Sequence, residues 1–373
     1  MKLLTVTKTL LILGFLLSSK IVWGQRPSCT QVLADANTQY SEGRLTFIEE
    51  DEFNGCFRAD GYSKEERVAA RRLVTLVHIY EDRIPEAEDA MVQLLNDDPE
   101  HPIDETLDPY EFVYLYNKFR TKPIFRVGFR LGATRSTYNL IDEFGVDQTG
   151  VDDQIRGELT PEIGLQGGVY IDYNFWNRFE ASLGLSFAQR NVKYDNGLYP
   201  GAISLTTVDT TGEVSAADDF YGPTSYTDNN SFLDIPLFIK YNIPLGQNFV
   251  VYPYGGVIGS FLISASRSGT RIGGTAVNPG SINLKDVGLR ESLNYSYTAG
   301  IGFKIRNGVD YFVIEGGYGI GGNNFVDPDG RYQNNDLIFR LGQIDGNQGI
   351  DFVSFTVGYQ KSFYNPKKLK EFR

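Results

Sequence analysis

The segment DFVSFTVGYQKSF at residues 351–363 decides the fold, because two chemical types alternate along it. The first set is apolar apart from Lys361 and contains Val353, Phe355, Val357, Tyr359 and Phe363. The second set is small or polar and contains Ser354, Thr356, Gly358, Gln360 and Ser362. Successive side chains of a β-strand point to opposite faces. The alternation therefore predicts a strand with lipid on one face and a polar interior on the other.

The same alternation recurs upstream, and it predicts eight strands in all. Five are regular, at 125–132, 163–173, 179–190, 233–243 and 295–305, and two are less regular, at 249–264 and 311–320. The connections alternate between short ones near 175–178, 244–248 and 306–310 and long ones at about 139–161, 191–231, 265–293 and 321–350. Short periplasmic turns and long outside loops are typical of bacterial outer-membrane barrels. We therefore predict an eight-stranded antiparallel transmembrane β-barrel over residues 123–363, followed by a charged tail at 364–373.

A soluble β-sandwich is the alternative, because it shares the two-residue period. The chain holds 23 Tyr and 25 Phe, and aromatic residues cluster near the ends of the long predicted strands. Aromatic belts at the two interfaces of a membrane favour the barrel. The net charge of −12 argues against a nucleic-acid partner.

Residues 1–24 have the pattern of a secretory signal peptide. Lys2 and Lys8 form a positive region, and an apolar run follows at residues 9–19. Gly24 is a small residue suited to cleavage. The apolar run is shorter than the ~20 residues that a membrane helix needs, which disfavours the alternative of an uncleaved anchor.

Residues 25–120 form a predicted all-α domain that begins with a helical hairpin. Helices are expected at 30–43 and 45–56, with Cys29 at the start of the first and Cys56 at the end of the second. An antiparallel pair would bring these two cysteines together, and an exported chain with an even cysteine count favours a disulfide. Two free thiols are the alternative if the chain never meets an oxidising compartment.

A second helical pair and a final helix complete this domain. Ser63 and Glu66 have the spacing of a capping box. The next helix should bury Ala69, Leu73, Leu76, Val77 and Tyr80, and its partner Ala87, Ala90, Met91, Leu94 and Leu95. The last helix should run from Asp108, as its cap, to about Arg120.

Two parts of the chain resemble known families. The Tyr80-to-Ala87 spacing, followed by Asp98-Pro99, resembles a tetratricopeptide repeat. The segments LDIPLFIKY at 233–241 and YPYGG at 252–256 resemble the porin-family outer-membrane β-barrel proteins of Bacteroidetes. The second resemblance implies a barrel in the bacterial outer membrane. The first implies a domain that binds peptides or protein partners, with a structural plug or spacer as the alternative. Eight strands put both ends of the barrel, and with them the helical domain, on the periplasmic side.

Charged residues on the inward faces of the predicted strands are the candidate site. They are Arg126, Arg130, Asp172, Glu180, Arg190, Asp234, Lys240 and Lys304. Opposite charges in a narrow lumen should pair and close it. Both histidines, His78 and His101, precede the barrel, which excludes a His-dependent triad within it. We expect no catalytic residues, cofactor or metal.

These observations predict a non-enzymatic barrel that anchors a periplasmic helical interaction domain. Its partner would be a periplasmic or outer-membrane protein, within an envelope complex for secretion, assembly or uptake. The alternative is a small channel or ligand-binding barrel with a site formed by its loops.

Overall fold

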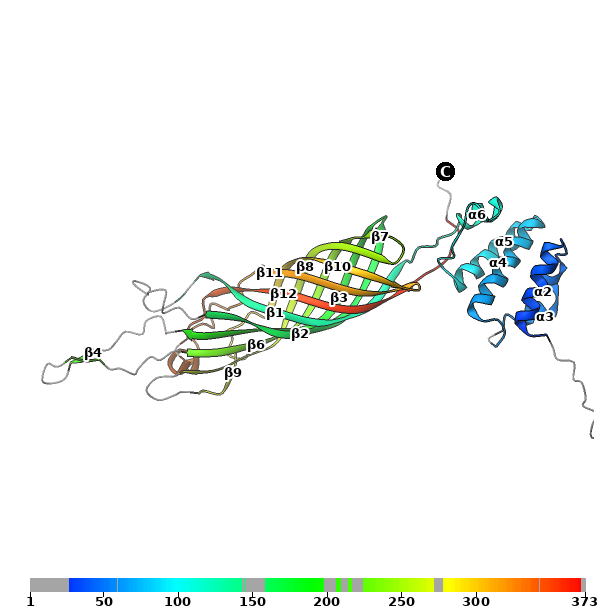
Figure 1. Ribbon diagram of the computed structural model, residues 1–373. Coiled ribbons are helices and arrows are strands. Elements are labelled where there is room, and N and C mark those ends of the chain that lie inside the picture. The colour runs from blue at the N-terminus through cyan, green and yellow to red at the C-terminus, as the bar shows by residue number, and fades with distance from the viewer. Residues whose placement is uncertain are drawn as a thin grey trace, which may run out of the picture. The chain divides into compact units, whose positions relative to one another are not determined.

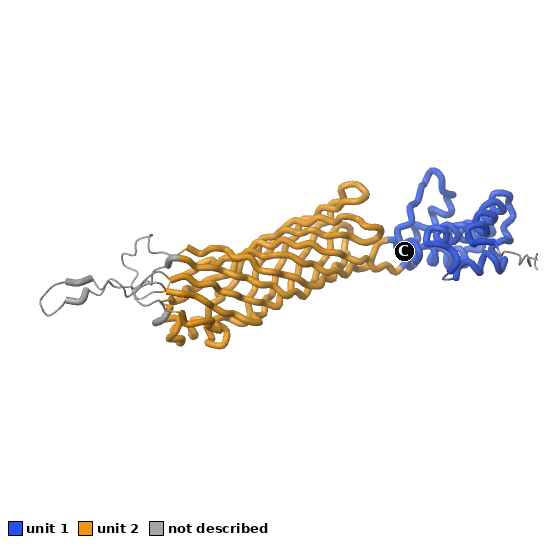
Figure 2. Tube along the Cα trace, turned by 60° about the horizontal axis from the view of Figure 1, so that its bottom comes forward, with its two compact units in different colours: residues 1–121, 366–373 blue, residues 122–365 orange. Residues whose placement is uncertain are grey.

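The computed structural model describes residues 27–58, 60–142, 144, 158–197, 206–208, 214–216, 224–271, 278–341 and 343–369. The predicted signal peptide at 1–24 lies outside these residues. The chain divides into two compact units, coloured separately in Figure 2. Residues 122–365 form the β unit, and residues 1–121 with 366–373 form the helical unit.

Eight long strands make up the β unit in the part of the chain that the structure describes (Figure 1). They are β1 (Phe125–Asp142), β2 (Glu158–Trp176), β3 (Phe179–Gly197), β6 (Thr224–Tyr241), β8 (Phe249–Arg271), β10 (Leu293–Asn307), β11 (Asp310–Gly321) and β12 (Asn347–Phe363). Short β7 (Ile243–Leu245) and β9 (Ser281–Asn283) pair with β8, and β4 (Thr206–Val208) pairs with β5 (Val214–Ala216).

The eight strands close into an antiparallel ring. Each long strand pairs with its neighbour in the chain, β1 pairs with β12, and β8 pairs with β10 across the 272–292 connection. Val353, Phe355 and Val357 of β12 are 49–56% exposed, whereas Thr356 and Gln360 are buried. The alternation seen in the sequence therefore separates an apolar outside from a polar inside. The fold is the predicted eight-stranded barrel preceded by helices.

The strands reach further into the long connections than predicted. The segment 191–231 was expected to be a loop, but β3 continues to Gly197 and β6 begins at Thr224, with Tyr194 opposite Tyr226. The physical reason is that these residues are largely polar on both faces. They lack the apolar alternation that marks a strand in contact with lipid, although their backbones continue the ladder.

A bulge in β8 explains why its faces could not be predicted. Ser231 of β6 pairs with Ser264, but the next residue pairs with Leu262, which leaves Ile263 unpaired. Before the bulge, even-numbered residues such as Leu262 are buried; after it, Arg267 is buried. An extra residue reverses which positions face inward.

The helical unit begins with α2 (Cys29–Ser41) and continues through η1 (Thr46–Glu49), α3 (Asp51–Gly55), α4 (Lys64–Tyr80), α5 (Ile84–Asp97) and α6 (Tyr110–Tyr116). The prediction of one helix over 45–56 was wrong, because Glu50 has an extended backbone that separates η1 from α3. The capping box of Ser63 and Glu66 is confirmed. Among the described residues, none of the helices is both long and apolar enough to cross a membrane.

Three details of the helical prediction were also wrong. Ala70, rather than Ala69, is buried in α4, and Tyr80 is 78% exposed because it lies in the last turn. Asp108 does not cap α6. Its carboxylate instead accepts a hydrogen bond from the backbone N–H of Asp104 and pairs with Arg72. Burial opposes ionisation of Asp108, but these donors outweigh it and lower its pKa.

The chain segment that follows β12 returns to the helical unit. Lys368 forms a β-bridge with Phe119. The N–H of Arg120 donates to the carbonyl of Lys367 at 3.0 Å, and the N–H of Leu369 donates to that of Lys118 at 2.7 Å. Residues 366–369 therefore pair with the helical unit, although the sequence suggested only a charged tail.

Candidate functional site

Most of the buried charged residues that the structure describes in the barrel form four groups, and Arg331 and Asp351 lie outside them. All eight predicted lumen charges are buried: Arg126, Arg130, Asp172, Glu180, Arg190, Asp234, Lys240 and Lys304. Each has an oppositely charged partner. Ionised groups lose most of their hydration on burial, so this arrangement depends on close pairing.

The first group lies near the short turns and centres on Glu180. Lys304 Nζ donates to its two oxygens at 2.7 and 2.9 Å, and Arg126 Nη1 donates at 2.7 Å. Glu180 has no exposed surface. One carboxylate thus serves two cations, which gives the group a formal charge of +1.

The second group has two cations and two anions. Lys240 Nζ lies 3.1 Å from Asp172 Oδ2 and 3.2 Å from Glu315 Oε1. Arg130 lies 3.1 Å from Asp172 and 3.3 Å from Glu315. Tyr252 donates its hydroxyl proton to Glu315 at 2.7 Å. Glu315 did not emerge from the sequence, because the pattern of β11 is interrupted by glycines. The signal that could have identified Glu315 as an inward charge is its position between Ile314 and Gly316 in a predicted strand.

The third group is a single pair surrounded by aromatic rings. Arg190 Nη2 lies 2.5 Å from Asp234 Oδ2, and Nη1 donates to Ser260 at 3.3 Å. The guanidinium carbon is 4.8 Å from the ring centre of Phe232 and 4.4 Å from that of Phe352. These rings stabilise the cation.

The fourth group lies at the opposite end of the barrel from the short turns. Arg267 donates to both oxygens of Asp228, at 2.6 and 2.7 Å, and to both oxygens of Asp345, at 2.7 and 3.0 Å. Arg290 contacts the same two carboxylates at 2.9 and 2.6 Å. None of these four residues was predicted, because Arg267 follows the bulge in β8 and Arg290 and Asp345 lie in connections.

One carboxylate of the fourth group, that of Asp345, stays ionised well into the acid range. Burial opposes ionisation of Asp345, which lies in the connection before β12, but Arg267 and Arg290 outweigh burial and hold its pKa well below its usual range. The group is covered by an apolar cluster built from strand ends and connections, which includes Ile282, Leu284, Leu289, Phe325, Val326, Leu337 and Leu341. The long connections are thus partly folded onto the barrel end.

Glycines in the strands make room for aromatic rings inside the barrel. A Cβ on Gly302 would lie 2.3 Å from a ring carbon of Tyr252, and one on Gly317 would lie 2.4 Å from the hydroxyl of Tyr254. Gly316, Gly317 and Gly319 lie within β11, as the predicted strand at 311–320 requires.

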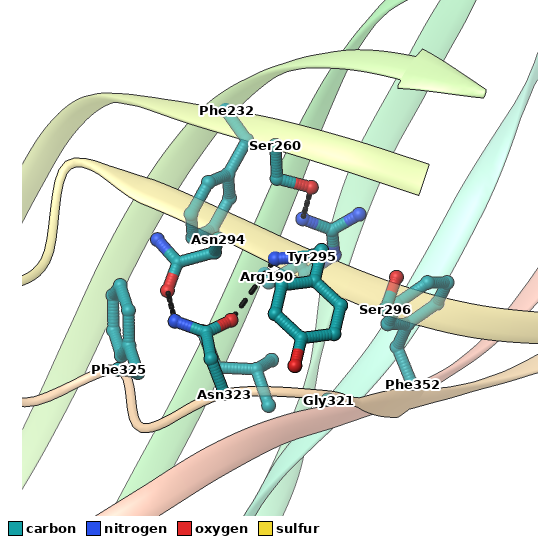
Figure 3. Close-up of a pocket in the computed structure, with 11 residues that line it drawn as sticks. Arg190, Phe232, Ser260, Asn294, Tyr295, Ser296, Gly321, Asn323, Phe325 and Phe352 are labelled. Carbon is teal, nitrogen blue, oxygen red and sulfur yellow. Dashed lines mark hydrogen bonds between the residues drawn. The ribbon is translucent and has the colours of Figure 1, made fainter. Parts of the chain in front are cut away.

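Small cavities lie between these groups, and two of them are lined by described residues that include Arg190. Figure 3 shows one of them, in which Arg190 approaches Ser260, and the side chain of Asn323 links Asn294 to the backbone of Tyr295. It offers about 20 Å³ to the centres of water molecules, and a neighbouring cavity beside Glu315 offers about 30 Å³. One water needs about 10–15 Å³ on this measure, so each cavity can hold about one to three waters.

The helical unit contains the cysteine pair. The structure joins Cys29 and Cys56 by a disulfide with a Cα–Cα distance of 5.6 Å. Cys56 lies in a core with Leu33, Phe47 and Phe53. The bridge therefore ties the start of α2 to the end of α3.

The ring of strands, apolar outside and charged inside, defines a transmembrane β-barrel. Residues 118–327 match the family described as outer membrane protein beta-barrel domain. This match spans more than half of the chain, so the protein belongs to that family and to the bacterial outer membrane. The comparison with curated proteins gave no match.

Solved structures of outer-membrane proteins are similar to this chain at low identity. Ail of Yersinia pestis, bound to the heparin analogue sucrose octasulfate, is 12% identical, with 64% of this chain and 99% of Ail covered and a TM-score of 0.27. OprG of Pseudomonas aeruginosa is 15% identical, with 65% and 98% covered and a TM-score of 0.30. The protease OmpT of Escherichia coli is 10% identical, with 64% and 96% covered and a TM-score of 0.31.

Proposed function

We propose that the barrel is a closed, non-enzymatic membrane anchor that holds the helical unit in the periplasm, where this unit binds a protein partner. The partner would be a periplasmic or outer-membrane subunit of a complex for secretion, assembly or uptake. The observation that carries the proposal is the interior of the barrel, where four groups of paired charges are buried and two cavities between them hold about one to three waters each. Ion flow needs a continuous water path, so such a barrel serves better as an anchor.

The proposed orientation rests on the connections. The turns after β2, β6 and β10 are short, whereas those after β1, β3, β8 and β11 are long. In outer-membrane barrels the short turns are periplasmic and the long loops are outside. β1 begins and β12 ends at the short-turn end, which supports a periplasmic location for the helical unit. A disulfide between Cys29 and Cys56 suits that oxidising compartment.

Epitope tags test this orientation. A tag inserted after Asn278, an exposed residue of a long connection, should be labelled on intact cells. A tag after Gln247, in the turn before β8, should be labelled only after the outer membrane is permeabilised. The reverse labelling pattern would refute the orientation.

The packing of α4 against α5 supports a role in partner binding. Leu76 of α4 and Ala87, Met91 and Leu94 of α5 are buried in one cluster, as in a helical repeat. The junction of the two helices leaves Tyr80 78% exposed and Ile84 43% exposed. Helical pairs of this kind resemble tetratricopeptide repeats, which stack on neighbours or bind peptides.

A second candidate function is a small channel or ligand-binding barrel. It is favoured by the two cavities and by buried hydroxyls next to them, such as Ser296 Oγ and Thr298 Oγ1, which have no hydrogen-bond partner in the structure. Polar atoms of this kind normally bind water or a ligand.

Conductance and partner capture distinguish the two functions. The purified protein in planar bilayers should show no steady ion current, and affinity purification from detergent-solubilised membranes should yield a stoichiometric protein. The Tyr80→Ser and Ile84→Ser double variant should lose this partner while its barrel stays folded. Steady current without a stoichiometric partner would overturn the anchor and favour the channel.

A further inference from the structure

Two connections at the barrel end away from the short turns fold together into a cap. The first contains β9, which Figure 1 shows at the opposite end of the barrel from β7, and the second contains the π-helix η3 (Asp336–Leu341). The two connections pair with each other through a β-bridge between Arg290 and Val326. The N–H of Glu291 also donates to the carbonyl of Phe325 at 2.9 Å. We call residues 281–291 and 323–341, with Asp345, the outer cap.

Apolar side chains of the outer cap pack against the strands of the barrel. Leu284, Phe325 and Leu341 are 0–1% exposed. They belong to one cluster with Phe232 and Leu262, which lie on strands. Connections normally run over the surface of a protein and bury few side chains. The outer cap is therefore a folded cover on the barrel end.

The fourth charged group joins the outer cap to the barrel wall. Asp228 lies on β6 and Arg267 on β8, whereas Arg290 and Asp345 belong to the cap. Arg290 contacts Asp228 at 2.9 Å, and Asp345 contacts Arg267 at 2.7 Å. We call these four residues the latch. In the other three groups every member lies on a strand, so only the latch connects the wall to a separate part of the fold.

The latch can separate without leaving a charge unpaired. On the wall, Arg267 donates to both oxygens of Asp228, at 2.6 and 2.7 Å. Within the cap, Arg290 contacts Asp345 at 2.6 Å. Each half of the latch is thus a neutral ion pair, and lifting the cap divides the group into these two pairs. An unpaired buried charge is costly, and this arrangement avoids one.

The cavity drawn in Figure 3 lies beneath the outer cap. Asn323 and Phe325 of the cap line it together with the strand residues Arg190, Ser260 and Ser296. Phe325 also belongs to the apolar cluster of the cap. Ser296 Oγ and Arg190 Nε are buried and have no hydrogen-bond partner in the part of the chain that the structure describes. Buried polar groups of this kind bind water or another polar molecule.

We propose that the outer cap is a lid over this cavity and that the latch holds the lid shut. With the latch open, the cavity meets the water beyond the barrel end and admits a small polar solute to Ser296 and Arg190. The first and second charged groups still close the lumen, so the open lid exposes a blind cavity and carries no ion current. The lid belongs to the barrel alone and does not depend on the partner of the helical unit.

Labelling of an engineered cysteine tests the lid. Ser296→Cys puts a thiol in the wall of the cavity, at a position that is 5% exposed. Cys29 and Cys56 are the only native cysteines and are joined in a disulfide, so no other thiol competes. The full-length protein, purified from membranes into lipid vesicles, is treated with iodoacetamide, and intact mass gives the labelling rate. Heat-modified gel mobility verifies that each barrel is folded.

The test variant adds Arg290→Met and Asp345→Asn to the Ser296→Cys protein. These changes remove both latch charges of the cap and leave the ion pair on the wall intact. The matched control instead adds Asp329→Asn and Gln333→Met, at two exposed positions of the same cap.

A second control adds Lys304→Met to the Ser296→Cys protein, which changes a buried charge near the short turns. We expect slow labelling in the Ser296→Cys protein and in both controls. Labelling should be roughly tenfold faster or more in the test variant, because a covered group reacts in proportion to the time that its cover is open. The mobility of the folded barrel should not change.

Three results would overturn the proposal. Equal rates in the test variant and the matched control would show that the latch does not hold the cap. Fast labelling of the Ser296→Cys protein itself would show that the cap is no lid. Equally fast labelling after Lys304→Met would show that the reagent enters through the lumen. If the test variant does not fold, Asp345→Asn alone, which keeps the shape of the side chain, is measured in its place with the same expected result.

Discussion

Replacing Glu180 by glutamine tests whether the barrel interior is closed. Glu180 is fully buried and is the anion that Lys304 and Arg126 share, at 2.7–2.9 Å. Glu180→Gln keeps the shape of the side chain but leaves two buried cations without an anion. Breaking a buried pair in this way costs about 3–5 kcal/mol.

Removing one cation of the same group should lower the free energy of unfolding much less. Lys304→Met removes one cation and leaves Arg126 paired with Glu180, so the formal charge of the group falls from +1 to zero. The apolar chain of methionine suits the vacated volume. Asp329→Asn is the control for an exposed carboxylate, and surface changes of this kind stay within about 0.5 kcal/mol.

The assay is urea unfolding of each variant in lipid vesicles, followed by heat-modified gel mobility, with planar-bilayer current measured on the same samples. We expect Glu180→Gln to lower the unfolding midpoint far more than Lys304→Met does, and we expect Asp329→Asn to leave it almost unchanged. Equal midpoints for Glu180→Gln and Asp329→Asn would show that water solvates the interior. The closed-lumen explanation would then be wrong.

Two further changes have defined outcomes. Gly302→Ala places a Cβ 2.3 Å from the ring of Tyr252 and should destabilise the barrel by about 1–3 kcal/mol in the same unfolding assay. The control Gly259→Ala, whose Cβ would meet no atom within 4 Å, should have little effect. Similar losses of stability at both sites would refute the role of ring packing. Cys29→Ser removes a disulfide between residues 27 positions apart and should lower the free energy of unfolding of the helical unit by roughly 3–4 kcal/mol in the chain-entropy model, as measured by thermal unfolding. Free alkylation of Cys29 and Cys56 in exported, unreduced protein would contradict the disulfide.

The barrel could be predicted from the sequence because a membrane strand repeats every two residues. The apolar set from Val353 to Phe363 faces outward, as its alternation required. The same rule placed Glu180 and Lys304 inside, since both lie on regular strands. The lengths of the connections predicted which end of the barrel has the short turns. These features depend on local residue types, which a sequence displays directly.

Only the tertiary structure decided which inward charges meet. Glu180 and Lys304 are 124 positions apart, and Arg267 and Asp345 are 78 apart, so no local pattern links them. The bulge at Ile263 reverses the faces of β8, and only pairing with β6 reveals it. The direction of α6 likewise follows from the cluster around Phe112. Closure of the ring brings distant residues together, and that closure is a property of the whole chain.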